Sequence, residues 1–340
     1  MRNTAYFFIS TIAIVITLIY GQNLLQPFIF ALLLWFIVRK IRHLLNKVKF
    51  IKKYFPSWVK SLIPSIILIL IFAFISRLLM ANINSLAKSY PVYEQNVAIM
   101  IAQLNEVFQM NLVDYFKSHA ADFDFGTILK RIFQSLSDLL SNAFIILIYA
   151  LFIFLEETHF PTKLRAMFSD KKQFNELNEV LDEIEKSITS YIGLKTLVSF
   201  ITGFASYIVL IFIGIDAPLF WAFLIFLLNY IPTIGSLIGT LFPAIFCLLQ
   251  FGDFNSCLLV LGIVGGIQVV VGNLLEPKLM GNSLNISSFL AIFALSFWGA
   301  LWGITGMLLS VPITVIMVLI FSHFNSTKPI AIMLSEKGKI

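Results

Sequence analysis

At residues 229–235 the chain reads Asn-Tyr-Ile-Pro-Thr-Ile-Gly, and this stretch interrupts an apolar run that extends from 218 to 250. A second apolar run, 286–323, is interrupted by the glycine-rich stretch 298–306. At 1.5 Å per residue, runs of 33 and 38 residues would form single helices of about 50–57 Å. The hydrocarbon core of a bilayer is only ~30 Å thick. Each run therefore predicts a re-entrant helical hairpin whose legs meet near mid-membrane.

The first break combines a helix breaker with polar side chains. Pro232 cannot donate a backbone hydrogen bond and disfavours helix in the residue before it. Gly235 permits a positive φ angle. The freed carbonyl and amide groups at such helix ends bind polar groups or ions. A simple proline kink is the alternative, but the added polar residues favour a substrate site that contains Asn229, Tyr230, Thr233 and Gly235.

The second break is rich in small residues, which allow close approach of helix backbones. These are Gly299, Gly303 and Gly306, and Pro312 adds a kink in the following leg. Trp298 and Trp302 are four residues apart and share a helix face. We predict that these tryptophans line the substrate cavity or lie in an interfacial aromatic belt, and that the glycines and Pro312 act as hinges.

The span between the two hairpins carries three further candidate residues. Gln268 lies deep in the apolar segment 255–275 and must find a partner, and Asn273 follows it. Glu276 stands at the inner end of the span. A charge inside a membrane is costly and often functional. Glu276 is therefore either a proton- or cation-coupling carboxylate or a helix-end charge paired with Lys278.

Composition assigns the chain to the integral membrane proteins. Hydrophobic residues make up 59% and charged residues 12% of the sequence, against about 25% charged residues in soluble domains. We predict an all-α, polytopic membrane protein of about eight segments. Lysines and arginines gather in one acid-free segment, 39–60, which the positive-inside rule places in the cytoplasm. Both termini are then cytoplasmic, and the net charge of +6 does not indicate a nucleic-acid partner.

Enzymatic and metal signatures are missing from the sequence. The two cysteines and four histidines lack the spacing of a metal site or a disulfide framework. A P-loop is also lacking, so ATP-driven transport by this chain is not expected. We predict neither catalytic residues, nor a metal, nor a cofactor.

Five segments are predicted along the chain. They are a scaffold at 1–80, an extracytoplasmic helical insert at 81–137, a span with a cytoplasmic amphipathic helix at 138–190, a transport core at 191–325 and a cytoplasmic tail at 326–340.

The core contains an internal repeat. A simple span precedes each hairpin (192–213 and 255–275). The charges of the connecting segments favour opposite orientations of the two units, which is the arrangement of an inverted repeat. The insert is a packed cap, a gate or an oligomer contact. The apolar seam 174–188 packs on its own bundle or binds a partner.

Three stretches resemble the autoinducer-2 exporter family, also called PerM-like permeases. They are 229–235 running to Pro243, then Glu276-Pro277-Lys278-Leu279-Met280-Gly281-Asn282-Ser283-Leu284, and finally 297–299 with 303–312. Two features differ from the family pattern. Ile286-Ser287-Ser288 replaces a His-Pro pair, and Glu156-Glu157 replaces an Asp-Arg type pair.

The resemblance implies a homo-oligomer, a pentamer, in the bacterial inner membrane that exports small hydrophilic molecules such as the quorum-sensing signal autoinducer-2. We expect the hairpin-bearing core to move in an elevator-like manner, with lipid, substrate and a proton or sodium ion as partners. Some members of the family are assigned sodium(lithium)/proton antiport, which is the first alternative. The second alternative is a non-transporting membrane scaffold.

Overall fold

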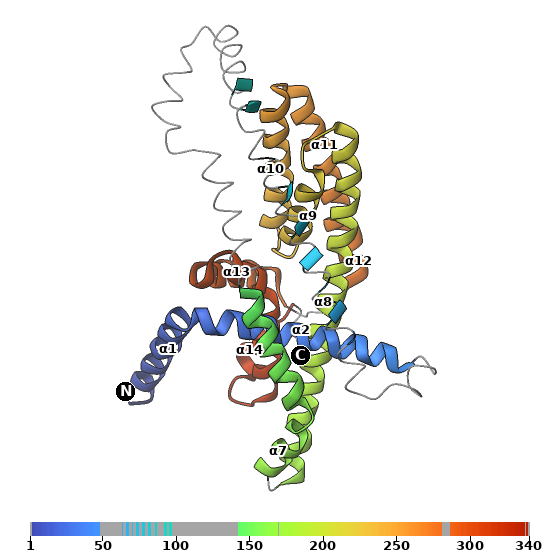
Figure 1. Cartoon of the computed structure of the whole chain (residues 1–340). Helices are drawn as coiled ribbons and strands as arrows, with labels where there is room; N and C mark the ends of the chain where they lie inside the picture. Colours follow the sequence, from blue (N-terminus) through green and yellow to red (C-terminus); the bar gives the residue numbers. More distant parts are fainter. Residues whose placement is uncertain are drawn as a thin grey trace. The chain divides into compact units, whose positions relative to one another are not determined.

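The computed structural model of the protein describes residues 2–47, 142–168, 170–280, 286–336 and 338, together with scattered positions between 63 and 96. The elements in these ranges are helices (Figure 1). Contacts divide the chain into two compact units. Unit 1 is Met1–Leu70, Leu140–Leu194 and Asn282–Ile340, and unit 2 is Ile71–Leu139 and Lys195–Gly281. This division into two units is based on contacts and says nothing about function. The five functional segments predicted from the sequence therefore stay predictions.

Several helices have the length and composition of membrane spans. Five segments qualify: Gln22–His43, Lys171–Ile213, Ile234–Phe251, Phe254–Met280 and Phe289–His323. A sixth forms if Asn142–Glu157 and Phe160–Met167, bent by 64°, are one span. The chain is thus a polytopic helical membrane protein, as predicted. The total of about eight segments stays a prediction. The sequence predicts a further span at 61–80, of which only scattered positions are described, and most of the insert at 81–137 lies outside the described residues.

Unit 1 begins with the predicted N-terminal helix pair. Helix α1 (Arg2–Tyr20) and helix α2 (Gln22–Lys47) are joined by a turn at Gly21. The sequence predicts helices at about 4–20 and 24–38, with the turn at Gly21-Gln22-Asn23 and Pro27. Two details of this prediction were wrong: Pro27 lies inside α2, and α2 continues to Lys47. The extension is stabilised by charge, since Arg39 forms an ion pair with Glu185 at 3.1 Å and lysine and arginine favour helix.

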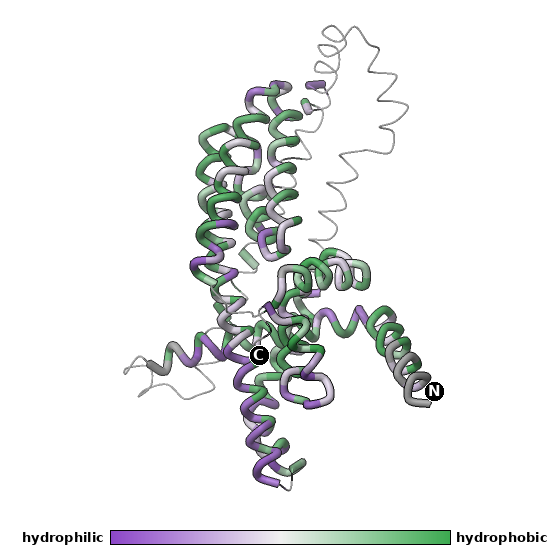
Figure 2. The backbone as a smooth tube through the Cα atoms, turned by 180° about the vertical axis from the view of Figure 1, so that it is seen from behind, coloured by the Kyte–Doolittle hydropathy of each residue, from purple (hydrophilic) through white to green (hydrophobic). Residues whose placement is uncertain are grey.

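Helix α8 (Lys171–Ile213) merges two elements that the sequence suggested were separate, the amphipathic helix and the span at 192–213. Its 43 residues correspond to a length of about 65 Å. Figure 2 shows hydrophilic residues concentrated in its first part, which adjoins α7 (Phe160–Met167). Ile184 and Ile188 of the predicted seam are buried within the chain. That end of the seam therefore packs on its own protein.

Unit 2 contains the first hairpin and the helix that follows it. Its elements are α9 (Pro218–Leu228), α10 (Ile234–Phe251), α11 (Phe254–Val270), the π-helix η1 (Val271–Leu275) and α12 (Glu276–Met280). In Figure 1, α9, α10 and α11 lie alongside the C-terminal part of α8. Their core is formed by fully buried side chains that include Phe220, Trp221, Phe246, Val260 and Val264. Aromatic packing joins the two legs of the hairpin, since the ring centroids of Trp221 in α9 and Phe246 in α10 are 4.8 Å apart.

The chain folds back on itself at the first predicted break. Thr233 has a φ of 56°, and a Cβ added to Gly239 would lie 3.6 Å from the α-carbon of Ile225. Along one straight helix these two residues would be about 21 Å apart. Helices α9 and α10 therefore form a hairpin around residues 229–233.

The second predicted break is also a reversal of the chain. Helix α13 (Ser288–His323) contains non-helical angles at Trp302 and Gly303, where Gly303 has a φ of 59°. The Trp298 indole donates a hydrogen bond to the Thr314 hydroxyl at 3.3 Å, although 16 residues of straight helix would span about 24 Å. Helix α14 (Lys328–Leu334) follows α13 and packs against it. The placement of either hairpin at membrane depth stays a prediction.

Candidate functional site

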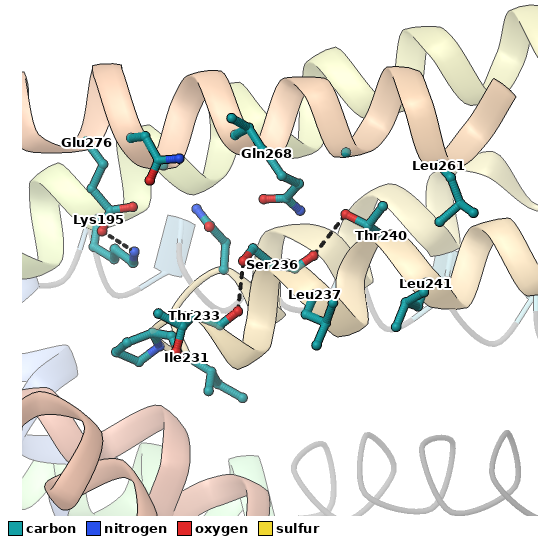
Figure 3. A pocket seen from close by; sticks show the side chains of 16 residues that line it. Lys195, Ile231, Thr233, Ser236, Leu237, Thr240, Leu241, Leu261, Gln268 and Glu276 are labelled. Carbon is teal, nitrogen blue, oxygen red and sulfur yellow. Dashed lines mark hydrogen bonds and ion pairs between the residues drawn. The ribbon is translucent and has the colours of Figure 1, made fainter. Parts of the chain in front are cut away.

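A cavity of about 500 Å³ lies within unit 2 beside the first break (Figure 3). This volume falls in the range of small-molecule sites. Its polar lining residues are Lys195, Asn229, Thr233, Ser236, Thr240, Gln268, Asn273 and Glu276. Five of these were predicted as site residues from the sequence: Asn229, Thr233, Gln268, Asn273 and Glu276. The fold thus brings the end of α9, the start of α10 and the α11–α12 segment to one cavity.

Helix α10 contributes a row of hydroxyl groups. Thr233, Ser236 and Thr240 follow each other at steps of three and four, so they share one face of the helix. Each hydroxyl donates its proton to a backbone carbonyl: Thr233 to Pro232 at 2.7 Å, Ser236 to Thr233 at 2.8 Å and Thr240 to Ser236 at 2.9 Å. With these protons committed, the hydroxyl oxygens offer lone pairs, and the α10 wall acts as a hydrogen-bond acceptor.

Gln268 lies on α11 and faces α10 across the cavity in Figure 3. Its side chain is buried, and the Nε2 group has no hydrogen-bond partner among the described residues. Glycine opposite makes room for the amide, because a Cβ at Gly239 would lie 3.4 Å from Nε2. A buried donor without a partner costs about 1–3 kcal/mol. Such a group is suited to a ligand that brings an acceptor.

Lys195 of α8 forms an ion pair with Glu276 of α12 at the edge of the cavity. Lys195 is 4% exposed, whereas the Glu276 side chain is 24% exposed. Sequence reasoning assigned Glu276 to the site but missed its partner. The single charged residue of the apolar segment 192–213 was the available signal, because a buried charge requires a counter-charge.

Asn229 and Tyr230 fasten the break to α8. Asn229 Nδ2 donates to the Ser199 hydroxyl at 3.1 Å, and the Tyr230 hydroxyl hydrogen-bonds that of Thr196 at 2.6 Å. Asn229 also lines the cavity, whereas Tyr230 and Gly235 are absent from its lining. Gly235 instead packs directly against the end of α9, since a Cβ there would lie 1.7 Å from the Leu228 oxygen.

The candidate residues of the second break belong to unit 1 and make structural contacts there. The Trp302 indole donates to the Leu18 carbonyl at 2.9 Å, and that of Trp298 donates to Thr314. Gly306 packs against the Trp298 carbonyl much as Gly235 packs against that of Leu228. The other predicted hinges lie in the same helix: Gly299 next to Met307, Gly303 at the reversal and a buried Pro312. The substrate-binding role of the two tryptophans stays a prediction.

Within the described ranges, no group of three or more histidine, cysteine or acidic side chains could hold a metal ion. The chemistry available in the cavity is therefore that of hydroxyl and amide groups and one ion pair. This set can bind and orient a polar ligand.

Comparison with known proteins identifies the family. The sequence model of the AI-2E family of transporters matches residues 8–326. The AI-2 transport protein TqsA of Escherichia coli strain K12 is 29% identical over 330 residues, which cover 94% of this chain and 92% of TqsA. A protein of Borreliella burgdorferi whose assigned name refers to transport is 34% identical over 257 residues, covering 74% and 70% of the two chains. The chain therefore belongs to the AI-2E family of transporters.

Proposed function

We propose that this protein is a secondary transporter of the bacterial inner membrane that exports a small hydrophilic molecule resembling autoinducer-2. The name of the E. coli relative, an AI-2 transport protein, supports the substrate class. The observation that carries the proposal is the Nε2 group of Gln268, which has no hydrogen-bond partner in the described part of the chain and is buried in the wall of a cavity large enough for such a molecule.

The two walls of the cavity suit a polyhydroxylated ligand. The hydroxyl oxygens of Thr233, Ser236 and Thr240 accept hydrogen bonds, and Gln268 Nε2 donates one. A ligand hydroxyl both donates and accepts, so a molecule with several hydroxyls would satisfy both walls. Asn229 and Asn273 would add amide groups at the end near the break.

In this proposal both hairpins are re-entrant, and the two legs of each hairpin meet near mid-membrane. The hairpin at 229–235 would carry the substrate in an elevator-like movement, with Glu276 as the proton- or cation-coupling residue. The termini would be cytoplasmic, and the homo-oligomer, a pentamer, is taken from the resemblance to the family. The unusual backbone at Thr233 and Gly303 supports breaks of the kind that form transporter sites.

Efflux of autoinducer-2 from proteoliposomes tests the proposed function. We expect Gln268→Leu to lower the initial efflux rate by roughly 5- to 150-fold, because loss of a hydrogen bond to a buried polar group costs ~1–3 kcal/mol. Ser206→Ala is the matched control, since the buried Ser206 hydroxyl also lacks a partner among the residues that the structure describes but does not line the cavity. Efflux equal in wild type, Gln268→Leu and empty liposomes would refute the proposal.

A second candidate function, sodium(lithium)/proton antiport, is favoured by the Lys195–Glu276 ion pair at the cavity. It predicts that sodium or lithium added outside proteoliposomes moves protons without any organic substrate. A pH-sensitive dye inside the vesicles reports this movement. Glu276→Gln should abolish it if antiport is the function.

A further inference from the structure

The Lys195–Glu276 ion pair is asymmetric in its access to the cavity. The Lys195 side chain is 5% exposed and enclosed by the bundle, whereas the Glu276 side chain is 24% exposed. Both residues line the same cavity. A small ion that enters the cavity would therefore reach the carboxylate of Glu276 while the ammonium group stays enclosed.

The pair also sets the net charge of the cavity. Lys195 and Glu276 are the charged side chains among its described lining residues, so their charges cancel. An unpaired charge within a membrane costs several kcal/mol, whereas a bonded pair is tolerated. Without Lys195, the carboxylate of Glu276 would need a cation from solution to keep the empty cavity neutral.

The surroundings of Glu276 could hold such a cation. Asn273 lies three residues before Glu276 and lines the same cavity, and its amide oxygen is a hard, uncharged donor. Carboxylate and amide oxygens together are ordinary ligands for small, hard cations. Asn273 and Glu276 thus place both kinds of oxygen in the lining of one cavity, and the lysine pairs with the carboxylate of Glu276.

We infer that the Lys195 ammonium is a built-in counter-cation, standing where a free monovalent cation would otherwise bind the Glu276 carboxylate. The wild-type cavity is thereby neutral when empty and needs no bound metal cation, so of the two coupling ions proposed for Glu276 this inference favours the proton. This inference deepens the proposed function, and it rests on it in one respect: both take this cavity as the transport site. The test below measures thermal stability and not transport, so either proposal can be refuted while the other stands.

The test is the melting temperature of the full chain in detergent, measured in sodium chloride and in N-methylglucamine chloride at equal ionic strength. Lys195→Ala removes the ammonium and leaves Glu276 accessible. We expect sodium to raise the melting temperature of this variant by about 4 °C at about a hundred times its dissociation constant. Propylammonium chloride, which replaces the lost group, should act in the same direction.

Two controls make the inference falsifiable. Wild type should show no comparable rise, because Lys195 already occupies the site, and Lys195→Ala/Glu276→Gln should show none, because it lacks the carboxylate. Equal melting of Lys195→Ala in both salts, or the same sodium effect in all three proteins, would overturn the inference. If Lys195→Ala is too unstable to purify in N-methylglucamine, its folded yield in the two salts is compared, and equal yields count against the inference.

Discussion

The α-carbon of Gly235 packs against the carbonyl oxygen of Leu228, so closely that a Cβ there would lie 1.7 Å from that oxygen. The second hairpin repeats this relationship, because a Cβ at Gly306 would lie 1.9 Å from the Trp298 oxygen. Both hairpins thus bring the start of the second leg onto the last turn of the first, and only glycine permits this approach.

We therefore expect Gly235→Ala and Gly306→Ala each to destabilise the protein by about 1–3 kcal/mol or more, because backbone atoms must move to admit the methyl group. Thermal unfolding in detergent measures the effect. Gly262→Ala and Gly266→Ala are matched controls in α11, where an added Cβ meets nothing within 4 Å. The controls should melt at or slightly above the wild-type temperature. Equal melting of all four variants would contradict this packing.

Gln268→Leu should separate stability from transport. The substitution removes a buried donor that has no partner in the described structure and keeps a similar side-chain volume. We expect stability to be unchanged or to rise by up to ~1–3 kcal/mol, even though efflux falls. A clear drop in melting temperature would show that the amide stabilises the fold, and would remove the reason for assigning it to a ligand.

Trp302 is expected to stabilise unit 1 through its indole. The N–H group donates to the Leu18 carbonyl in the last turns of α1, where carbonyls lack intrahelical partners. Trp302→Phe should lower stability by about 1–3 kcal/mol, because it leaves that carbonyl unpaired. The KM for autoinducer-2 should stay unchanged. A raised KM with normal stability would instead support the substrate-binding role predicted from the sequence.

The sequence was sufficient to locate both breaks, because proline and glycine act locally on the backbone. It also indicated Gln268 and Glu276, since a polar group in an apolar helix is conspicuous. The ion pair of Glu276 with Lys195 could not be predicted, because 81 residues separate the two and their contact depends on how α8 packs. The continuity of α8 was missed for a related reason. Hydropathy changes near residue 190, but the residues on both sides favour helix.

Asn96, in the insert predicted at 81–137, contacts the end of the first hairpin. Its Nδ2 group donates to the carbonyls of Leu249 and Gln250, at 3.2 and 2.6 Å, in the last turn of α10. Asn96→Ala should cost about 1–2 kcal/mol, because it removes the hydrogen bonds to these terminal carbonyls. Asn255→Ala is a suitable control, since its described bond to Asp253 uses only the backbone amide. Identical melting of the two variants would show that this contact contributes nothing.

Asp253 gives the protein a contribution to stability that depends on pH. As the N-cap of α11, its carboxylate accepts hydrogen bonds from the backbone amides of Ser256 and Asn255, which lower its pKa below the ordinary value. The contribution is present above the ordinary pKa and is lost as the pH falls through the lowered folded-state pKa, a window below about pH 4.

An asparagine side chain caps a helix equally well without titrating, so Asp253→Asn should match wild type at pH 7. Between pH 5 and 3 the melting temperature of wild type should fall more steeply than that of the variant. Parallel curves would mean that Asp253 has the same pKa in the folded and unfolded protein.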